Sequence, residues 1–384
     1  MKIVYCIPLI DASGGMERVL SLKSNYLADR FGFEVVIIVT DSYGKPPFYT
    51  FSPKIRIINL NINFEELWKK KFHTRLLGYL LKQYQYKRSL SRCLSDIKPD
   101  ITISMLRRDI NFISSIRDGS IKIGEFHFNR ANYRDYRKGI RFAFLRKIAT
   151  AWGMRQLIRK VKKLDRFVVL SEEDKQQWTE LDNIVVIHNP LPFFTSKTSL
   201  LTRKEVISAG RYTYQKGFDL LINAWKIVHG RHPDWNLSIY GEGNPDTFTT
   251  QIERLGLKET CFLKPAVSNI EEKYLESSIY VLSSRYEGFG MVIAEAMACG
   301  VPAVSFSCPC GPREIITDGE NGLLVEPGNI GELADKICYL IEHDDIRQEM
   351  GVKAKISAER FKIERIMDQW KSLFESLTES GNRS

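Results

Sequence analysis

The feature that most constrains the fold of this chain is an alternation between short, β-branched apolar runs and longer stretches with helical periodicity. Runs such as KIVYCIPL at 2–9 and FEVVIIVT at 33–40 are apolar nearly throughout, which is typical of parallel strands buried on both faces. The stretches between them, beginning with GGMERVLSLKSNYLADR at 14–30, have the spacing of helices that cover a sheet. The sequence therefore predicts an α/β protein built on parallel sheets.

The alternation runs through the chain twice. The first series ends with IVVIHNP at 184–190, and the second begins with EVISAG at 205–210 after a proline-punctuated connection. Other expected strands lie at 55–60, 100–105, 121–127, 166–171, 236–241, 261–265, 279–284, 302–307 and 322–326. This pattern predicts two doubly wound, Rossmann-like domains that face a cleft, and ligands of such sheets bind beyond the carboxyl ends of the strands.

The domain boundaries follow from the connection between the two series. Residues 1–195 are expected to form the N-terminal domain and residues 196–360 the C-terminal domain. Residues 361–384 contain an amphipathic pattern, FKIERIMDQWKSLFESL, followed by a polar tail. We expect this last segment to form a helix that packs back on the N-terminal domain.

The net charge of +10 is unevenly distributed along the chain. Residues 1–195 hold 34 Lys and Arg against 19 Asp and Glu, whereas the remainder holds 22 against 27. Two segments, 67–92 and 134–163, mix these cations with aromatic residues and leucine at helical spacing, which favours binding to an anionic membrane surface. A core-facing stripe with a solvated basic face is one alternative. A nucleic-acid platform is another, but no nucleic-acid motif accompanies the charge.

The N-terminus and the cysteines indicate a cytoplasmic protein. MKIVYCIPLI starts with an expected strand and lacks the features of a signal peptide, and no apolar run approaches the roughly 20 residues that cross a bilayer. The seven cysteines are scattered and are expected to be buried free thiols. Cys308 and Cys310 have no second pair of metal ligands at zinc-finger spacing, so no metal site is expected.

Two strand-to-helix junctions carry candidate anion ligands. Gly14 and Gly15 follow the first expected strand, and their flexible backbone and free helix-start amides suit a phosphate, although a plain turn is the alternative. Arg211 and Lys216, in SAGRYTYQKGFDLL, place two cations between a strand and a helix. They could clamp a diphosphate or could be ordinary solvated charges.

Two further motifs bear on ligand chemistry. SIYGEGNPD contains two glycines of a dinucleotide fingerprint, but Asp246 stands where the third glycine belongs, so NAD is not expected. RYEGFGMVIAEAMACG places Glu287 in a loop and Glu295 about five residues into an apolar helix. A lone carboxylate on such a helix is costly unless a polar group meets it, and that group could be a ligand or a neighbouring side chain.

Together these motifs resemble the retaining, nucleotide-sugar-dependent glycosyltransferases of the GT-B fold, family four, whose hallmark is two glutamates separated by seven residues. Glu287 and Glu295 match that hallmark. The motifs GGMERV, GRYTYQKGFDLLINAW, SIYGEG and GPREIITDGENGLLVEPGN agree in order and spacing. The resemblance is nearly continuous over residues 205–345, whereas the N-terminal half matches only at the glycine loop and at GEFHFN.

The resemblance implies roles for residues of the C-terminal, donor-binding domain. Glu295 would accept hydrogen bonds from the ribose hydroxyls, and Glu287 from hydroxyls of the transferred sugar, as ionised carboxylates can. Arg211 and Lys216 would hold the diphosphate and stabilise the charge that grows on it in the transition state. The helix start would face the sugar and its diphosphate with the backbone amides of Gly288, Phe289, Gly290 and Met291.

It also implies roles for the N-terminal, acceptor-side domain. Gly14 and Gly15 would add amides to the donor site when the domains close, and His127 in GEFHFNR would lie near the reacting edge of the sugar. A satisfied structural histidine is the alternative for His127. The expected catalytic residues are thus His127, Glu287, Arg211 and Lys216, with no metal and no cofactor besides the nucleotide sugar as co-substrate.

The function implied is retaining transfer of a hexosyl or N-acetylhexosaminyl unit from a nucleotide sugar, with UDP favoured over GDP. The acceptor would be a glycan or a polyprenyl-diphosphate-linked oligosaccharide in lipopolysaccharide or capsule synthesis, at the inner face of the cell membrane. A GT-B enzyme that acts on a nucleotide sugar without glycan transfer, such as an epimerase or a phosphorylase, is the alternative.

Overall fold

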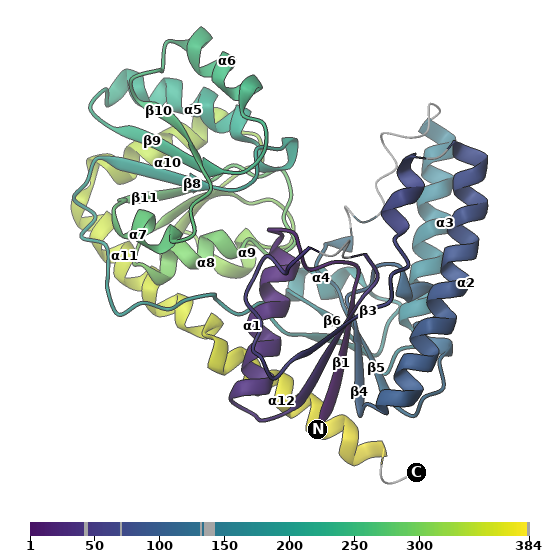
Figure 1. Cartoon of the computed structure of the whole chain (residues 1–384). Coiled ribbons are helices and arrows are strands. Elements are labelled where there is room, and N and C mark those ends of the chain that lie inside the picture. The colour runs from purple at the N-terminus through teal and green to yellow at the C-terminus, as the bar shows by residue number, and fades with distance from the viewer. Residues whose placement is uncertain (42–44, 70, 131–132, 134–142, 382–384) are drawn as a thin grey trace. The chain divides into compact units, whose positions relative to one another are not determined.

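The computed structural model describes residues 1–41, 45–69, 71–130, 133 and 143–381 (Figure 1). The chain divides into two compact units. Unit 1 comprises Met1–Pro190 and Ile363–Ser384, and unit 2 comprises Leu191–Lys362. Each unit is built on one parallel sheet with helices packed against it, which confirms the predicted α/β class.

The sheet of unit 1 has the strand order β3-β2-β1-β4-β5-β6-β7 within the described residues, and its strands pair in parallel. The strands are β1 (Lys2–Ile7), β2 (Glu34–Val39), β3 (Arg56–Asn59), β4 (Ile101–Ser104), β5 (Ile121–Glu125), β6 (Arg166–Val169) and β7 (Ile184–Val186). The order reverses between β1 and β4, where the register pairs Ile3 with Ile101. This reversal is the position at which doubly wound sheets place their ligands.

Helices cover both faces of this sheet, because successive side chains of a strand point to opposite faces. Ile3 and Tyr5 of β1 belong to the same apolar cluster as residues of α1 and α12, whereas Val4 and Cys6 belong to the cluster of α2 and α3. The helical elements of unit 1 are α1 (Gly15–Asp29), η1 (Phe64–Lys69), α2 (Phe72–Ile97), η2 (Asp109–Asn111), η3 (Ile113–Ser115), α3 (Ala143–Val161), α4 (Glu172–Gln177) and α12 (Ile363–Gly381).

Unit 2 has the strand order β10-β9-β8-β11-β12-β13, also parallel within the described residues. Its strands are β8 (Glu205–Ala209), β9 (Asn236–Gly241), β10 (Cys261–Pro265), β11 (Ile279–Leu282), β12 (Ala303–Phe306) and β13 (Gly322–Val325). Its helical elements are η6 (Tyr214–Lys216), α5 (Phe218–Arg231), α6 (Asp246–Leu255), α7 (Ile270–Leu275), α8 (Met291–Ala298), α9 (Pro312–Ile315), α10 (Ile330–Glu342), α11 (Asp344–Ala358) and η7 (Glu359–Phe361). Here the strand order reverses between β8 and β11.

Each strand expected from the sequence is present, usually one or two residues shorter than the apolar run that predicted it. The units meet in sequence at Pro190 and Lys362, beside the expected boundaries at 195 and 360. The C-terminal amphipathic pattern forms α12, which packs against α1 of unit 1.

The two basic segments differ in how far the structure describes them. Segment 67–92 spans the end of η1 and most of α2. Segment 134–163 lies partly outside the described residues, because 134–142 are not among them; its remainder forms α3. Within the described ranges, every helix is too short or too polar to cross a lipid bilayer.

The seven cysteines form no disulfide, and all of them except Cys93 are buried. In the part of the chain that the structure describes, no group of three or more His, Cys, Asp or Glu side chains converges in a way that could hold a metal ion.

Candidate active site

The loops that follow β8 and β11 carry most of the predicted site residues of unit 2. The two strands are neighbours at the point where the strand order reverses, so their carboxyl ends bring the two loops together. The loop after β8 holds Arg211 and Lys216, and the loop after β11 holds Glu287. Residues 71 positions apart in sequence thus share one edge of the sheet.

Hydrogen bonds to backbone carbonyls join these two loops to each other. The backbone amide of Arg285 donates to the carbonyl of Gln215 at 2.8 Å, and Gln215 Nε2 donates to the carbonyl of Tyr286 at 3.0 Å. Gly217, with φ +63°, lies so close that a Cβ atom there would be 2.1 Å from the carbonyl oxygen of Ser283. Only glycine combines this backbone conformation with this approach.

Glu287 is the acidic centre of this junction. Its Oε1 atom accepts hydrogen bonds from Lys216 Nζ at 2.8 Å and from Ser284 Oγ at 2.6 Å, and the residue is 6% exposed. The buried carboxylate is therefore stabilised by a cation and a hydroxyl. The structure brings the predicted residues Lys216 and Glu287 into direct contact.

Arg285 and Asp219 were not singled out in the sequence, yet they support the same junction. Arg285 Nη1 and Nη2 bind the Asp219 carboxylate in a bidentate pair at 2.8 and 2.7 Å. The guanidinium also donates to the carbonyl of Tyr214 and lies 3.9 Å from the centre of its ring. Such a forked pair fixes geometry as well as charge, and it holds η6 and the start of α5 against the loop after β11.

Glu295 is the fifth residue of α8 and is 1% exposed, on a helix whose neighbouring residues are apolar and buried. Burial, and then the nearby carboxylates Glu287 and Glu295, raise the pKa of Tyr280 well above its ordinary value. Tyr280 of β11 therefore lies in the electrostatic field of both acidic residues. The two glutamates of the motif act on one small region of unit 2.

The segment between the glutamates forms the start of α8. Gly290 precedes the helix with φ +87°, and Met291 is its first residue; in the first turn the amide of Ile293 donates to the carbonyl of Gly290 at 2.9 Å. Phe289 is buried, and its ring meets Phe361 edge to face at 5.5 Å. Its side chain thus packs inside unit 2, and its backbone carbonyl lies so close to Gly311 that a Cβ atom there would be 2.5 Å from the oxygen.

Arg211 differs from Lys216 in its surroundings. Its side chain is exposed and forms no ion pair with any residue that the structure describes. Gly241 and Gly243 are explained by packing: a Cβ at Gly241 would lie 2.3 Å from the carbonyl oxygen of Gly210, and Gly243 has φ +111°. Their presence needs no dinucleotide.

In unit 1, Gly14 and Gly15 stand at the start of α1, as predicted. A Cβ at Gly14 would lie 2.1 Å from Glu17 Oε2, whereas a Cβ at Gly15 would meet no atom within 4 Å. His127 follows β5, and its side chain is 6% exposed. Its Nε2 atom lies 3.1 Å from Glu125 Oε1, and Glu125 in turn binds Lys23. Glu125 and Lys23 were also missed in the sequence.

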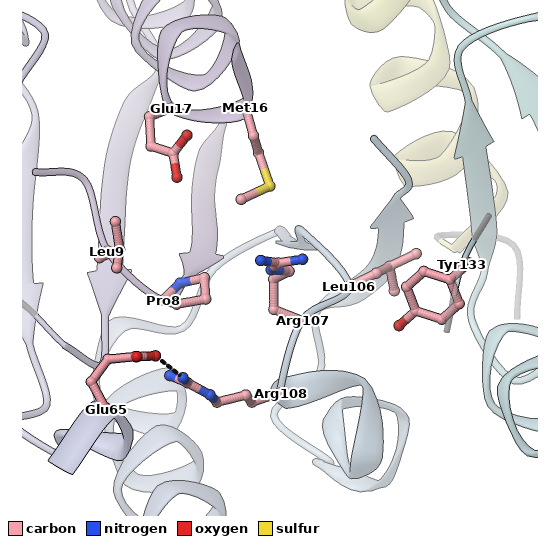
Figure 2. A pocket seen from close by; sticks show the side chains of 9 residues that line it. All are labelled: Pro8, Leu9, Met16, Glu17, Glu65, Leu106, Arg107, Arg108 and Tyr133. Atoms are coloured by element: carbon pink, nitrogen blue, oxygen red, sulfur yellow. Dashed lines mark hydrogen bonds and ion pairs between the residues drawn. The ribbon is translucent and has the colours of Figure 1, made fainter. Parts of the chain in front are cut away.

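A pocket of about 300 Å³ opens at the carboxyl ends of β1 and β4 in unit 1 (Figure 2). Arg107 and Arg108 both line it, but their charges are placed differently. Arg108 pairs with Asp41 and Glu65, whereas Arg107 lies 5.0 Å from the ring centre of Phe128 and forms no ion pair with a described residue. The remaining lining residues are Pro8, Leu9, Met16, Glu17, Glu65, Leu106 and Tyr133.

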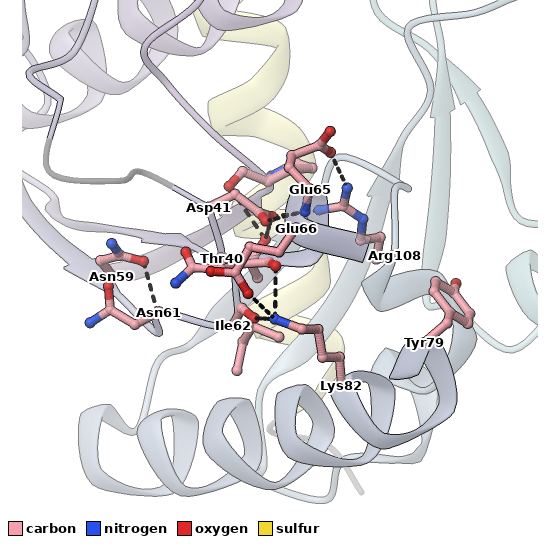
Figure 3. A network of polar contacts seen from close by, with 12 residues as sticks. Thr40, Asp41, Asn59, Asn61, Ile62, Glu65, Glu66, Tyr79, Lys82 and Arg108 are labelled. Carbon is pink, nitrogen blue, oxygen red and sulfur yellow. Dashed lines mark hydrogen bonds and ion pairs between the residues drawn. The ribbon is translucent and has the colours of Figure 1, made fainter. Parts of the chain in front are cut away.

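A polar network braces the wall of this pocket (Figure 3). Asp41 accepts from the hydroxyl of Thr40 at 2.6 Å and from the backbone amide of Glu65 at 3.2 Å, in addition to Arg108. Lys82 of α2 donates to the carbonyls of Ile62 and Asn63 and pairs with Glu66. These contacts fasten η1 and α2 to the edge of the sheet where the pocket opens.

Comparison with known proteins places these features in a family. Residues 193–357 match the family model of glycosyl transferases group 1. An uncharacterized glycosyltransferase of Haemophilus influenzae is 28% identical over 379 residues, which cover 97% of this chain and 99% of that protein. The poly(ribitol-phosphate) alpha-N-acetylglucosaminyltransferase of Staphylococcus aureus is 32% identical over 225 residues, but these span 57% of this chain and 46% of that protein.

The fold also matches solved structures. A variant of S. aureus TarM, in complex with fondaparinux, alpha-GlcNAc-glycerol and UDP, aligns over 97% of this chain and 99% of its own with a TM-score of 0.74 and 19% identity. At that identity the match shows the shared GT-B fold, in which two parallel-sheet domains are joined. The group 1 match over most of unit 2 and the full-length similarity to a glycosyltransferase together support a glycosyltransferase, and the likeness to group 1 rests on residues 193–357.

Proposed function

We propose that this glycosyltransferase transfers a hexosyl or N-acetylhexosaminyl unit, with retention, from a UDP-sugar to a glycan or lipid-linked oligosaccharide in cell-surface polysaccharide synthesis. The observation that carries the proposal is the Lys216–Glu287 ion pair. It lies where the strand order reverses between β8 and β11, beside the start of α8. It sets a cation, a buried acceptor and the start of a helix at the sheet edge where nucleotides bind. The UDP in the TarM complex and the polymer acceptor in the S. aureus relative's name support the donor and acceptor classes.

In this proposal the donor binds to unit 2 along the path from α8 to η6. Glu295 accepts from the ribose hydroxyls and Glu287 from hydroxyls of the sugar. The diphosphate lies against Arg211, Lys216 and the amides of Gly288 to Met291. Because Arg211 has an exposed side chain without an ion pair among described residues, its charge is available for the diphosphate.

Catalysis in this proposal is electrostatic. Breaking the anomeric bond leaves negative charge on the departing phosphate, and cations that are already in place stabilise that charge more in the transition state than in the substrate. The bond from Glu287 holds Lys216 in position before the donor arrives. The acceptor attacks on the face that the leaving group vacates, and the phosphate takes its proton. Unit 1 contributes Gly14, Gly15 and His127, with His127 near the reacting sugar.

We place the acceptor in the pocket of unit 1. It lies at the carboxyl ends of β1 and β4, and its volume of about 300 Å³ is at the lower end of small-molecule sites. Arg107 offers a cation to this pocket, whereas the charge of Arg108 is balanced by Asp41 and Glu65. An acceptor with an anionic group, such as the diphosphate of a polyprenyl carrier, fits that arrangement.

We also propose that unit 1 docks on an anionic membrane surface through α2. Five large apolar side chains of this helix are between 56% and 66% exposed: Leu76, Leu77, Leu80, Leu81 and Tyr84. Their spacing gathers them in a stripe on the helix surface, and Lys71, Lys87 and Arg88 are exposed nearby. A contiguous apolar patch beside basic residues suits the interface of an anionic bilayer. This would bring the enzyme to a lipid-linked acceptor at the inner face of the membrane.

Donor binding is tested by thermal shift of the full chain with UDP, GDP and a panel of their sugars. We expect stabilisation by UDP and by one UDP-sugar, because a ligand that binds only the folded state raises the melting temperature. Transfer should persist in EDTA, since the proposed leaving-group stabilisation uses no metal. Stabilisation by none of the nucleotides would refute the proposal. Turnover of a nucleotide sugar without an acceptor would instead point to the epimerase or phosphorylase type.

Two substitutions separate the proposed roles of the glutamates. Glu295→Ala should weaken UDP binding strongly, whereas Glu287→Ala should abolish transfer and weaken UDP binding less, through the loss of the bond that positions Lys216. Glu253→Ala, on the exposed surface of α6, serves as the control and should change neither. Near-normal transfer by Glu287→Ala, measured as release of UDP in the presence of acceptor, would contradict the role given to it.

A further inference from the structure

A buried ion pair links three elements of unit 1. Lys23 Nζ, on α1, donates to both carboxylate oxygens of Glu125 at 2.6 Å, and each side chain is 1% exposed. Lys23 Nζ also lies 3.6 Å from the ring centre of Trp370 on α12. Glu125 is the last residue of β5. One ionic centre therefore fastens α1, the carboxyl end of β5 and α12 to one another.

This pair is held in a water-excluded environment. Burial alone would oppose ionisation of Glu125, but its contacts with Lys23 and then with His127 stabilise the carboxylate and bring its pKa to about 2. Glu125 is thus a permanent carboxylate at physiological pH. A lysine with both carboxylate oxygens in reach and an aromatic ring over its ammonium group is fixed in one orientation, and it fixes the carboxylate in turn.

The carboxylate is in contact with His127. Nε2 of the imidazole lies 3.1 Å from Glu125 Oε1, a hydrogen-bonding distance, although the N–H direction is poorly aligned in this structure. An ionised carboxylate can only accept, so a hydrogen bond between the two groups requires a proton on Nε2. In a neutral imidazole the other nitrogen, Nδ1, is then the acceptor. Because Lys23 balances the charge of Glu125, a neutral imidazole leaves the centre without net charge.

We propose that Glu125 and Lys23 are positioning residues that hold His127 in the Nε2–H tautomer, with Nδ1 presented as an acceptor toward the site. Lys23 lies eight residues after Gly15 on the same helix, about 12 Å along its axis. The pair thereby also fixes the glycine loop relative to His127. The importance of this arrangement for transfer rests on the proposed function, whereas the tautomer itself does not.

The test is the tautomer of His127, observed by nitrogen-15 and carbon-13 NMR of the full chain labelled at histidine. The wild-type protein is expected to show His127 as the Nε2–H tautomer without any substitution, so this measurement does not depend on a variant that folds. His188 is an internal reference, because its Nδ1 lies 2.8 Å from the carbonyl oxygen of Leu170 and should carry the proton. A predominantly Nδ1–H form of His127 overturns the proposal.

Two variants test the positioning. Glu125→Gln offers an amide that can donate or accept, so both tautomers of His127 should appear while His188 is unchanged. Lys23→Met leaves the buried carboxylate without its cation and its fixed orientation, so the spectrum of His127 should change while that of His188 does not. Spectra of His127 in both variants that match the wild type would overturn the proposal.

Kinetics separate this inference from the proposed function. If His127 acts near the sugar, Glu125→Gln should lower kcat by about 10–100-fold with little change in donor KM, since a small displacement of a reacting group costs this much. A changed tautomer with unchanged kcat would support the positioning and refute the role of His127 in transfer. An unchanged tautomer with reduced kcat would refute the positioning and leave the proposed function standing.

Discussion

Glu287 shows how single residues prepare this site before any ligand binds. Its carboxylate is almost fully buried, which is costly for an isolated charge, and the bonds from Lys216 and Ser284 offset that cost. The same bonds hold the ammonium group of Lys216 at the sheet edge. The positions of both groups rest on the close approach of two loops, and that approach rests on Gly217.

Substitution of Gly217 should therefore disturb the site as well as stability. A Cβ would lie 2.1 Å from the carbonyl oxygen of Ser283, so Gly217→Ala must push the two loops apart. We expect it to weaken UDP binding and transfer at least about tenfold, with a loss of unfolding free energy beyond the roughly 1–2 kcal/mol of the left-handed conformation alone. Calorimetric titration with UDP and urea unfolding measure the two effects.

Gly256 provides the matched control. It has φ +70°, close to the +63° of Gly217, but a Cβ there would meet no atom within 4 Å. Gly256→Ala should lower the unfolding free energy only by the cost of the left-handed backbone conformation, and it should leave UDP binding unchanged. Equal effects of the two substitutions would show that loop contact at Gly217 does not matter.

Asp109 should make the stability of the protein depend on pH. Burial raises its pKa to about 6, against the opposing effects of Ser104, backbone amides and Arg107. A carboxyl whose folded pKa lies above its unfolded value of 3.8 stabilises the fold fully below pH 3.8, and this stability is lost as pH rises through 6. Between pH 4 and 7 this group should remove about 2–3 kcal/mol of unfolding free energy. Asp109→Asn should abolish that slope in urea unfolding; parallel curves for the two proteins would contradict it.

At the level of elements, α2 has two faces with different partners. Its inner face packs in the core of unit 1 through Tyr86, Leu90 and Leu94, whereas the stripe from Leu76 to Tyr84 is exposed. Burial of one such leucine in a bilayer is worth about 1.5–3 kcal/mol, or at least about tenfold in binding. Leu77→Glu with Leu81→Glu should therefore abolish binding to vesicles of equal parts phosphatidylglycerol and phosphatidylcholine, measured by co-sedimentation.

Helix α11 of unit 2 supplies a control with the same geometry. Val352 and Ile356 are also four residues apart and are 57% and 66% exposed, compared with 65% for each of Leu77 and Leu81. Val352→Glu with Ile356→Glu should leave vesicle binding intact. If both double variants bind vesicles as the wild type does, α2 is not the docking surface.

The elements were predictable from the sequence, and their mutual contacts were not. Strands such as β1 are apolar over their whole length, so a local pattern identifies them. Glu287 and Glu295 were found because they lie in one short motif. By contrast, Lys23 and Glu125 are 102 positions apart, and Arg285 and Asp219 are 66 apart. No local signal distinguishes such pairs from solvated charges, because only the strand order brings them together.

The whole molecule is organised so that unit 1 comes from both ends of the chain. Helix α12 contributes Ile366, Met367, Trp370 and Phe374 to the same core as β1 and α1. Trp370 is 1% exposed and covers Lys23. Trp370→Ala should cost about 3–5 kcal/mol, because it leaves a cavity and uncovers a buried charge. In calorimetry the temperature of the unfolding transition of unit 1 should fall, whereas that of unit 2 should not change.

Trp225 is the counterpart in unit 2, where it is fully buried on α5. Trp225→Ala should lower the unfolding temperature of unit 2 and leave that of unit 1 unchanged. If both variants shift the same transition, the two units do not unfold as separate bodies.

The return of α12 to unit 1 has a consequence for synthesis on the ribosome. Every residue of unit 2 is translated before Ile363. Unit 2 can therefore complete its core before α12, the last element of unit 1, has been made. Until α12 emerges, the apolar surface around Tyr5 and Leu20 is uncovered and Lys23 has no aromatic partner. The N-terminal half of the chain, although made first, is the last to finish folding, and chaperones that recognise exposed apolar surface should associate with it throughout translation of unit 2.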